Sequence, residues 1–352
     1  MMKNIRLQLL LILAVIVAWL PTPLVRADPA TLAKTPYEYS PGAYQVQTME
    51  YDWVDAKRDR KVPVKIYYPA DAKGRLPVII FSHGLGGSRE GYGYLGKYWA
   101  SHGYVSVHPQ HLGSDTSVWQ SVPLGERMQA LTKAAYDVTN AINRPLDISF
   151  VIDELAKLNA EDSPLKERLD LERIGMAGHS FGAYTTLAVA GQVFMSPEGK
   201  EISDREPRIK AAIPMSAPVP KSQEQVLDKA FAKINIPCFH MTGTLDDSPV
   251  GETKAAQRRI PFDHIQGTDE FLLIFNGGDH MVFSGRLRAQ GGGEKDQQFQ
   301  ALVCSSSTAF WDAYLKGDEK AKKWLTGKGF ETELGDKGTF EKKLKGAPSA
   351  SK

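Results

Sequence analysis

The stretch that most constrains how this chain can fold is residues 172–187, where a short apolar segment, a glycine-rich turn and a helix-compatible segment follow one another. The turn contains the pattern Gly178-x-Ser180-x-Gly182. A serine in a strained turn between a buried strand and a helix raises its hydroxyl above the sheet, and a side chain at either glycine would crowd that turn. A chance match in a flexible loop is the alternative, but the strand before the pattern and the helix after it favour a nucleophile elbow.

Apolar segments of strand length alternate with helix-compatible segments along most of the chain. This alternation predicts an α/β fold with a mostly parallel central sheet flanked by helices. Near the start, two segments of alternating polarity surround a charged run at 55–61, which is typical of an antiparallel hairpin. The predicted strands are residues 47–53, 62–68, 76–81, 104–108, 174–177, 209–215, 234–241 and 271–275.

A second glycine-rich segment, residues 82–87, follows the predicted central strand 76–81. Acyl transfer builds negative charge on the carbonyl oxygen of the substrate, and two preorganised N–H groups stabilise that charge. In an elbow enzyme one N–H comes from the residue after the nucleophile, here Phe181, and the other from a glycine-rich loop after an early strand. We predict the backbone N–H of Leu85 as the second donor. By itself the segment would be an ordinary glycine turn, but it stands at the position that the elbow requires.

The acid and the histidine of a catalytic triad should follow the serine in that order along the chain. Asp246 and Asp247 follow the predicted strand 234–241, and His280 follows the strand 271–275. Both groups therefore lie just beyond the carboxyl ends of sheet strands, where open α/β folds place their sites. We predict Ser180, Asp246 and His280 as the triad. Asp247 is the alternative acid, although its position also suits a turn cap.

The remaining histidines and the two cysteines have simpler interpretations. His108 and His111 lie three residues apart near a strand end, but no carboxylate or third histidine has matching close spacing, so we expect no metal and no cofactor. His83 and His179 are expected to support the glycine-rich loop and the elbow. Cys238 and Cys304 can form a disulfide in an exported protein, or remain two buried free thiols.

Residues 1–27 have the organisation of a secretory signal peptide. Lys3 and Arg6 precede an apolar run from Leu7 to Leu20, and the small residues Val25 and Ala27 suit a cleavage site after residue 27. A retained membrane anchor is the alternative, but the apolar run is about fourteen residues where a span needs about twenty. We therefore expect an exported protein, periplasmic or secreted, with no stable membrane span after cleavage.

The composition is that of an ordinary globular protein, with 42% hydrophobic and 24% charged residues among 352. Residues 1–27 carry three cations and no acid, so their removal changes the formal net charge from +2 to −1. This balance gives no indication of a nucleic-acid partner.

We expect four parts along the chain: the signal peptide 1–27, a leader 28–45, a catalytic domain 46–318, and a C-terminal helix with a flexible tail at 319–352. Within the catalytic domain, the long connection 109–145 is expected to shape the entrance to the site, because loops on α/β sheets commonly do so. Two clear helices are predicted at 148–158 and 294–316.

The motifs at 81–87, 100–104 and 174–183 resemble those of the α/β-hydrolase superfamily. Within it, the chain is similar to bacterial dienelactone-hydrolase-like esterases and to the plasma type of platelet-activating-factor acetylhydrolase, over roughly residues 46–316. The resemblance implies a Ser180–Asp246–His280 triad and oxyanion donors at Leu85 and Phe181. Two features depart from those relatives. Dienelactone hydrolases use a cysteine nucleophile, and the segment 216–220, where the acetylhydrolases carry their acid, has none.

The positions of Asp246 and His280 resemble those in bacterial cutinases and polyester hydrolases. We therefore expect an exported serine esterase acting on a small-molecule, lipid or polymer ester. Polyester, cutinase-like or lipase activity is the alternative, and a small peptidase or a catalytically inactive binding protein is further removed. The inactive protein is an alternative because fold alone does not fix function. The complete set of catalytic residues argues against it, because an inactive site usually has gaps.

Overall fold

The computed structural model of this chain describes residues 37–196, 198–219, 227–285 and 294–346. The predicted signal peptide, the first part of the predicted leader and the last six residues lie outside these ranges. Within them, no helix is both long enough and apolar enough to cross a membrane.

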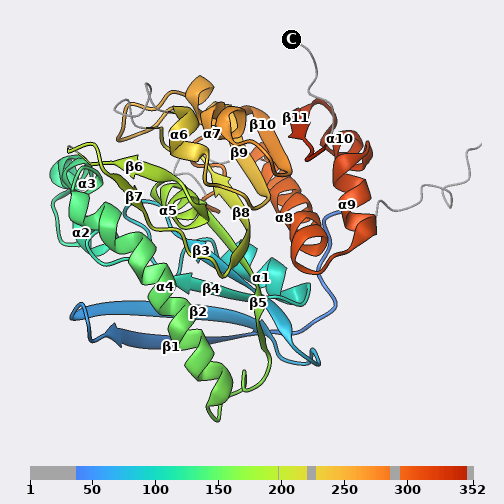
Figure 1. Cartoon of the computed structure of the whole chain (residues 1–352), viewed down its shortest axis with the longest axis horizontal. Coiled ribbons are helices and arrows are strands. Elements are labelled where there is room, and N and C mark those ends of the chain that lie inside the picture. The colour runs from blue at the N-terminus through green and yellow to red at the C-terminus, as the bar shows by residue number, and fades with distance from the viewer. Residues whose placement is uncertain (1–36, 197, 220–226, 286–293, 347–352) are drawn as a thin grey trace, which may run out of the picture. The chain divides into compact units, whose positions relative to one another are not determined.

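A nine-stranded sheet forms the centre of the fold, in the order β1-β2-β4-β3-β5-β8-β9-β10-β11 (Figure 1). The strands from β4 to β10 pair in parallel, whereas β1 with β2, β2 with β4, and β10 with β11 pair antiparallel. The predicted mostly parallel sheet with an N-terminal hairpin is therefore confirmed. The strands are β1 Val46–Asp55, β2 Arg60–Pro69, β3 Leu76–Ser82, β4 Val105–Pro109, β5 Leu169–His179, β8 Ile209–Met215, β9 Cys238–Leu245, β10 Glu270–Asp279 and β11 Gly338–Lys343, with β6 Val193–Met195 and β7 Glu201–Ser203 forming a separate hairpin.

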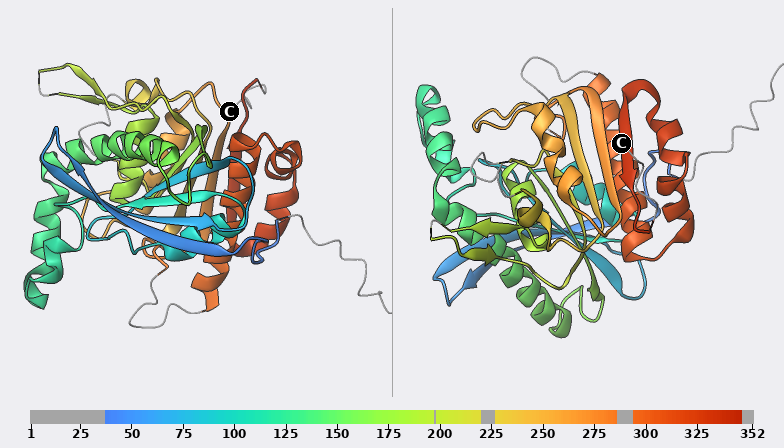
Figure 2. Two further views of the ribbon diagram at one scale, coloured as in Figure 1. Left: turned by 90° about the horizontal axis from the view of Figure 1, so that it is seen from below. Right: turned by 45° about the horizontal axis from the view of Figure 1, so that its top comes forward.

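Helices cover both faces of the sheet, and alternate residues of each strand face one or the other (Figures 1 and 2). On β3, Ile79 and Phe81 belong to the core under α1 and α8, whereas Val78 and Ile80 belong to the core under α4. Both faces of β3 are buried under helices, which explains why this strand is continuously apolar in the sequence. The helices are α1 Gly93–Ser101, α2 Ser117–Gln120, α3 Arg127–Ala135, α4 Val138–Ala160, α5 Phe181–Ala190, α6 Leu227–Phe231, α7 Ile260–His264, α8 Glu294–Leu315, α9 Glu319–Thr326 and α10 Gly329–Leu334.

The connection 109–145 is more helical than predicted, because α2, α3 and the first turns of α4 lie within it. Helix α4 begins at Val138, where the side chain of Asp137 accepts a hydrogen bond from the N–H of Thr139. The sequence prediction began this helix at residue 148, after Pro145. That proline lies inside the helix, so its ring interrupts the hydrogen bonding without ending the element.

The predicted C-terminal helix is present as α9, which contains Trp324, but the prediction of a flexible tail after it is wrong as far as residue 346. Helices α9 and α10 are followed by strand β11, which pairs with β10 as the last strand of the sheet. The ring of Phe340 lies 5.8 Å from that of Phe239 and 5.9 Å from that of Phe271. Because β11 is an edge strand with one large apolar side chain, its sequence lacks the apolar run by which the inner strands were recognised.

Buried neutral histidines give this fold a predicted dependence on pH. His108 is 1% exposed, and burial lowers its pKa to about 4 from an ordinary value near 6.5. The unfolded chain then binds more protons between these values, so stability is complete above about pH 6.5 and falls toward pH 4. This histidine alone accounts for a loss of about 3 kcal/mol.

The measurement is the free energy of unfolding by urea between pH 7 and pH 4, for wild type and His108→Gln. The variant should show a shallower decrease with acid, whatever its stability at pH 7. Equal slopes for both proteins would contradict the assignment of this loss to His108.

Candidate active site

Ser180 occupies the turn between strand β5 and helix α5, with φ of 57° and ψ of −117°. The turn needs glycine on both sides. A Cβ atom on Gly178 would lie 2.3 Å from the carbonyl oxygen of Gly182, and one on Gly182 would lie 1.9 Å from that of Ser82. The N–H of Ser180 donates to the carbonyl of Met215 on β8, 2.9 Å away, which attaches the turn to the sheet. The predicted strand–turn–helix geometry is therefore present.

Three predicted residues, 34 to 100 positions apart along the chain, meet above the sheet. The Oγ of Ser180 lies 2.9 Å from Nε2 of His280, and Nδ1 of His280 lies 2.7 Å from Oδ1 of Asp246. The other carboxylate oxygen accepts a hydrogen bond from Oγ1 of Thr242 at 2.8 Å. With the proton of His280 on Nδ1, Nε2 is an acceptor facing the serine hydroxyl, which is the arrangement that proton transfer from serine requires.

Of the two neighbouring aspartates, the structure brings Asp246 to the histidine. Asp246 is fully buried. The carboxylate of Asp247 is 56% exposed and instead accepts hydrogen bonds from the backbone N–H of Ala255 and from Nζ of Lys254, both at 2.9 Å. This is the turn-cap geometry that was the alternative explanation for Asp247.

Arg258 also belongs to this cluster, although no sequence pattern pointed to it. It is 2% exposed, and its Nη2 lies 3.4 Å from Oδ1 of Asp246 and 3.3 Å from Nδ1 of His280. Burial by itself raises the pKa of Asp246, but the hydrogen bond with His280 and the charge of Arg258 outweigh it, so the pKa lies below its usual value. The acid is therefore held as a carboxylate. No local motif surrounds Arg258, and only its burial beside Asp246 identifies it.

The predicted oxyanion loop lies against the serine. A Cβ atom on Gly84 would be 3.4 Å from Cβ of Ser180. Leu85 follows in this loop, and Phe181 is the first residue of α5, where an N–H has no acceptor within the helix. His83 supports the loop, as expected. Its Nδ1 lies 2.7 Å from the carbonyl of Gly84, and its Nε2 accepts the N–H of His111 at 3.0 Å.

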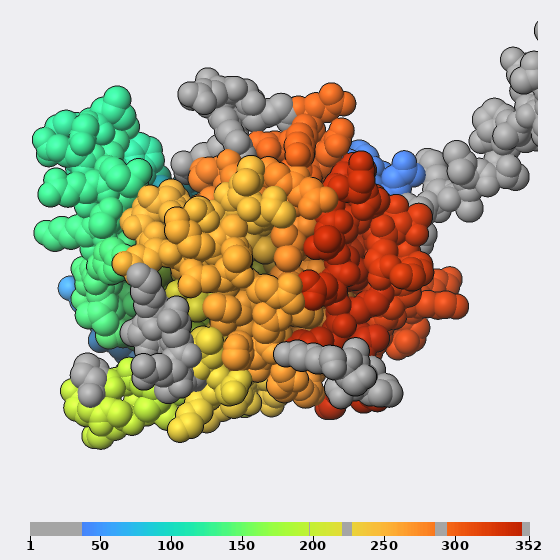
Figure 3. Space-filling view, turned by 90° about the horizontal axis from the view of Figure 1, so that it is seen from above, coloured from blue at the N-terminus to red at the C-terminus, as the bar shows by residue number. Residues whose placement is uncertain are grey.

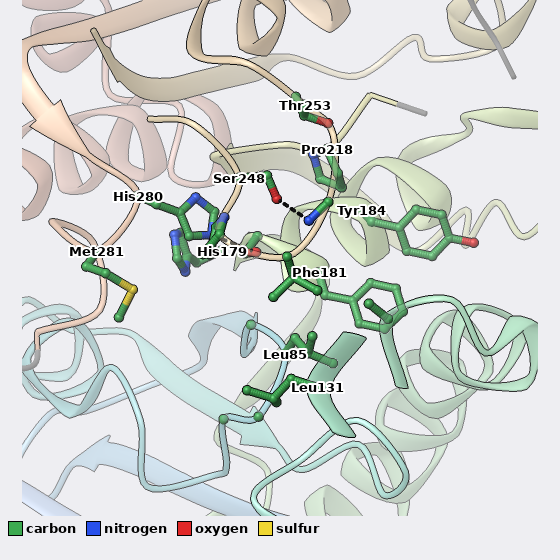
Figure 4. A pocket seen from close by; sticks show the side chains of 18 of the residues that line it. Leu85, Leu131, His179, Phe181, Tyr184, Pro218, Ser248, Thr253, His280 and Met281 are labelled. Carbon is green, nitrogen blue, oxygen red and sulfur yellow. Dashed lines mark hydrogen bonds between the residues drawn. The ribbon is translucent and has the colours of Figure 1, made fainter. Parts of the chain in front are cut away.

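A largely apolar cavity of about 740 Å³ opens beside Ser180 and His280 (Figure 4). One wall comes from α3 and the oxyanion loop, where Leu85 and Leu131 lie together, and the opposite wall comes from the segments around Pro218 and Thr253. Figure 3 shows the teal segment of α2 and α3 at the same surface as the gold segment that follows β9. The connection 109–145 thus lines the cavity, as predicted. The apolar side chains of the cavity include Leu85, Trp119, Met128, Leu131, Phe181, Tyr184, Pro218, Val219 and Val250.

One group of side chains away from this cavity has the composition of a metal site. Cys238, His240 and Glu270 are buried, with their ligand atoms within 4.8 Å of one another. Burial raises the pKa of the Cys238 thiol and of the Glu270 carboxyl and lowers that of His240 to about 3. Each of these shifts disfavours the charged form of its group, and the nearby ammonium of Lys343 adds positive charge. Nε2 of His240 and a carboxyl oxygen of Glu270 lie 2.8 Å apart and form a hydrogen-bonded pair.

The other predictions on histidine and cysteine have these outcomes. Cys238 and Cys304 are both buried free thiols, so the disulfide alternative is wrong. Nε2 of His108 lies 3.0 Å from Oγ of Ser106, and its Nδ1 lies 3.2 Å from the carbonyl oxygen of Gly91, so both ring nitrogens have a hydrogen-bond partner. His179, inside the elbow, has its Nδ1 2.7 Å from the hydroxyl of Tyr92.

The sheet order, the elbow and the order of serine, acid and histidine along the chain define an α/β-hydrolase fold. The family described as Chlorophyllase matches residues 34–197, slightly less than half of the chain. The chain is 26% identical to the platelet-activating factor acetylhydrolase of Cavia porcellus over 42% of each chain, and 28% identical to that of Bos taurus over 38% of each. It is also 25% identical to cutinase est1 of Thermobifida alba, over 62% of this chain and 57% of that protein. The match thus spans about two fifths of the length of the acetylhydrolases.

Proposed function

We propose that this protein is an exported serine hydrolase that cleaves carboxylic esters through an acyl-enzyme. The observation that carries the proposal is the continuous hydrogen-bonded chain from Ser180 through His280 to Asp246 beside an apolar cavity. Relatives named acetylhydrolase and cutinase support ester hydrolysis as the reaction class. Export rests on residues 1–27, which lie outside the described residues.

In the proposed reaction, Oγ of Ser180 attacks the ester carbonyl carbon while Nε2 of His280 takes the hydroxyl proton. The carbonyl oxygen becomes an oxyanion, to which the N–H groups of Leu85 and Phe181 donate. The C–O bond to the alcohol breaks as His280 returns the proton to the leaving oxygen. Water, deprotonated by His280, then attacks the carbonyl carbon of the acyl-enzyme. The bond to Oγ of Ser180 breaks as His280 returns the proton to that oxygen, which releases the acid and restores the serine. Asp246 holds the histidine in the required tautomer and stabilises its imidazolium form.

The cavity favours an ester with an apolar acyl or alcohol part, because most of its lining side chains are apolar. A short, acetyl-type acyl group is the first candidate, since relatives named acetylhydrolase match the chain. Hydrolysis of longer or polymeric esters is the second candidate. The acid position after β9 and the longer match to the cutinase, over 62% of this chain, favour it.

Labelling with a fluorophosphonate probe and turnover of p-nitrophenyl esters test the proposal together. We expect Ser180 to be labelled, and the acetate, butyrate and octanoate esters to be cleaved with a clear chain-length preference that separates the two candidates. A peptide anilide should be a poor substrate. Absence of both labelling and turnover would favour an inactive binding protein, and efficient anilide cleavage would favour a peptidase.

A further inference from the structure

A fully buried arginine lies behind the oxyanion loop. Arg144, on helix α4, is 0% exposed. Its Nη2 donates to the carbonyl oxygen of His83 and, at 3.0 Å, to Oγ of Ser82, while its Nη1 donates to Oγ of Ser114 at 2.8 Å. The carbonyl of Ser114 in turn accepts the N–H of Gly86 at 2.8 Å. Arg144 thus bonds directly to the start of the short loop that carries Leu85, and it is linked to the end of that loop through Ser114.

The same guanidinium also contacts the start of helix α5. Its Nε donates to Oγ1 of Thr185 at 2.9 Å, and that hydroxyl donates to the carbonyl of Phe181 at 3.0 Å. The guanidinium carbon lies 4.5 Å from the centre of the Phe181 ring, within the range of a cation–π contact. The two predicted oxyanion donors lie on different elements, and Arg144 joins both elements.

The hydrogen bonds of Arg144 leave its charge without a direct counter-ion. Within the described part of the chain, no carboxylate lies within ion-pair distance of its guanidinium. The nearest buried acid on the same helix, Asp147, is engaged by Arg58 at 2.9 Å and Arg60 at 2.7 Å. Burial lowers the pKa of Arg144 to about 9 and the charge of Asp147 partly offsets this, so the guanidinium is charged at neutral pH. A charge in a low-dielectric interior acts over several ångströms.

A second hydrogen-bonded series of serine, histidine and aspartate orients the hydroxyl of Ser82, which accepts a hydrogen bond from Arg144. Oγ of Ser82 lies 2.9 Å from Nε2 of His111, and Nδ1 of His111 lies 2.9 Å from Oδ2 of Asp147. All three residues are 0% exposed, so no substrate reaches this serine. With Nδ1 donating to the aspartate, Nε2 accepts the hydroxyl proton of Ser82. The lone pairs of Oγ of Ser82 then face the guanidinium of Arg144.

We propose that Arg144 is the positioning residue of the oxyanion hole. It holds the loop of Leu85 and the helix start of Phe181 in one geometry, and its unpaired positive charge stabilises the oxyanion of the tetrahedral intermediate. This role rests on the proposed function, because an oxyanion forms only if a carbonyl is attacked.

The test compares Arg144→Met, which removes the charge and the hydrogen bonds, with Arg144→Lys, which keeps the charge. Arg168→Met is the matched control, since Arg168 also donates to backbone carbonyls, those of Pro69 and Ala72, away from the cavity. We expect kcat for p-nitrophenyl acetate to fall by about 10²–10³ in Arg144→Met with KM changed only a few-fold, as for loss of an oxyanion donor. Arg144→Lys should recover part of kcat, and Arg168→Met should match wild type.

Two inhibitors separate positioning from general support of the fold. A trifluoromethyl ketone adds to Ser180 and forms an oxyanion, whereas the matching methyl ketone binds mainly as the neutral carbonyl. In Arg144→Met, or in Arg144→Lys if the first variant does not fold, affinity for the trifluoromethyl ketone should fall in parallel with kcat while that for the methyl ketone is retained. Equal losses for both inhibitors, or unchanged kcat in a folded variant, would overturn the role of Arg144 alone. A wild-type protein without turnover or fluorophosphonate labelling would overturn the proposed function as well.

Discussion

Ser180→Ala is expected to lower kcat for ester hydrolysis by about 10⁶-fold, as loss of the nucleophile does in a dissected serine protease. Without the hydroxyl no acyl-enzyme forms, and only the slow attack of water in the preorganised site remains. The folded state should be little affected. The substitution removes one partly exposed oxygen. Alanine keeps the Cβ atom that serine already has at this position, where φ is 57°.

The measurement is initial-rate kinetics on p-nitrophenyl acetate, with thermal unfolding of the same samples. Ser248→Ala is the control, because Ser248 also lines the cavity but lies outside the triad. It should keep nearly all activity. A folded Ser180→Ala protein with kcat near that of wild type would show that another group is the nucleophile.

Asp246→Asn is expected to lower kcat by about 10⁴-fold, the effect of the corresponding change in a serine protease. The amide of asparagine donates a hydrogen bond where the carboxylate accepted one. Nδ1 of His280 would then become the acceptor, and Nε2 would carry the proton toward Ser180 and be unable to take another. The geometry would survive with the wrong tautomer.

Asp247→Asn is the matched control for this prediction, since it makes the same chemical change one residue away. The side chain of Asp247 contacts Lys254 and Ala255, so we expect a change in kcat of less than about 3-fold and at most a small loss of stability, as for an exposed ion pair. Both variants are compared by kcat and by KM. If Asp247→Asn were the more damaging, the acid would be Asp247 and the hydrogen bond of Asp246 to His280 would not be the productive one.

Much of the fold was predictable because its signals are local. The elbow needs glycine at residues 178 and 182 for steric reasons confined to a few residues, and the inner strands are continuously apolar because helices cover both faces. Chain order then restricted the candidates for acid and histidine to the ends of two strands. The same reasoning underestimated α4, where Pro145 lies inside the helix, and missed β11, whose pairing with β10 leaves little trace in its side chains.

The sequence by itself determined the α/β class, the elbow serine and the candidate partners of that serine, because these follow from short patterns and from the order of elements. Only the tertiary structure decided which of two adjacent aspartates faces His280, and that Arg144 and Arg258 lie buried beside the site. Arg144 lies 62 positions from Ser82, and arginine is normally exposed, so no local pattern distinguishes a buried one. Burial of a charge is a property of the packed chain. Arg144 and Arg258 act strongly on the site only because packing removes them from water.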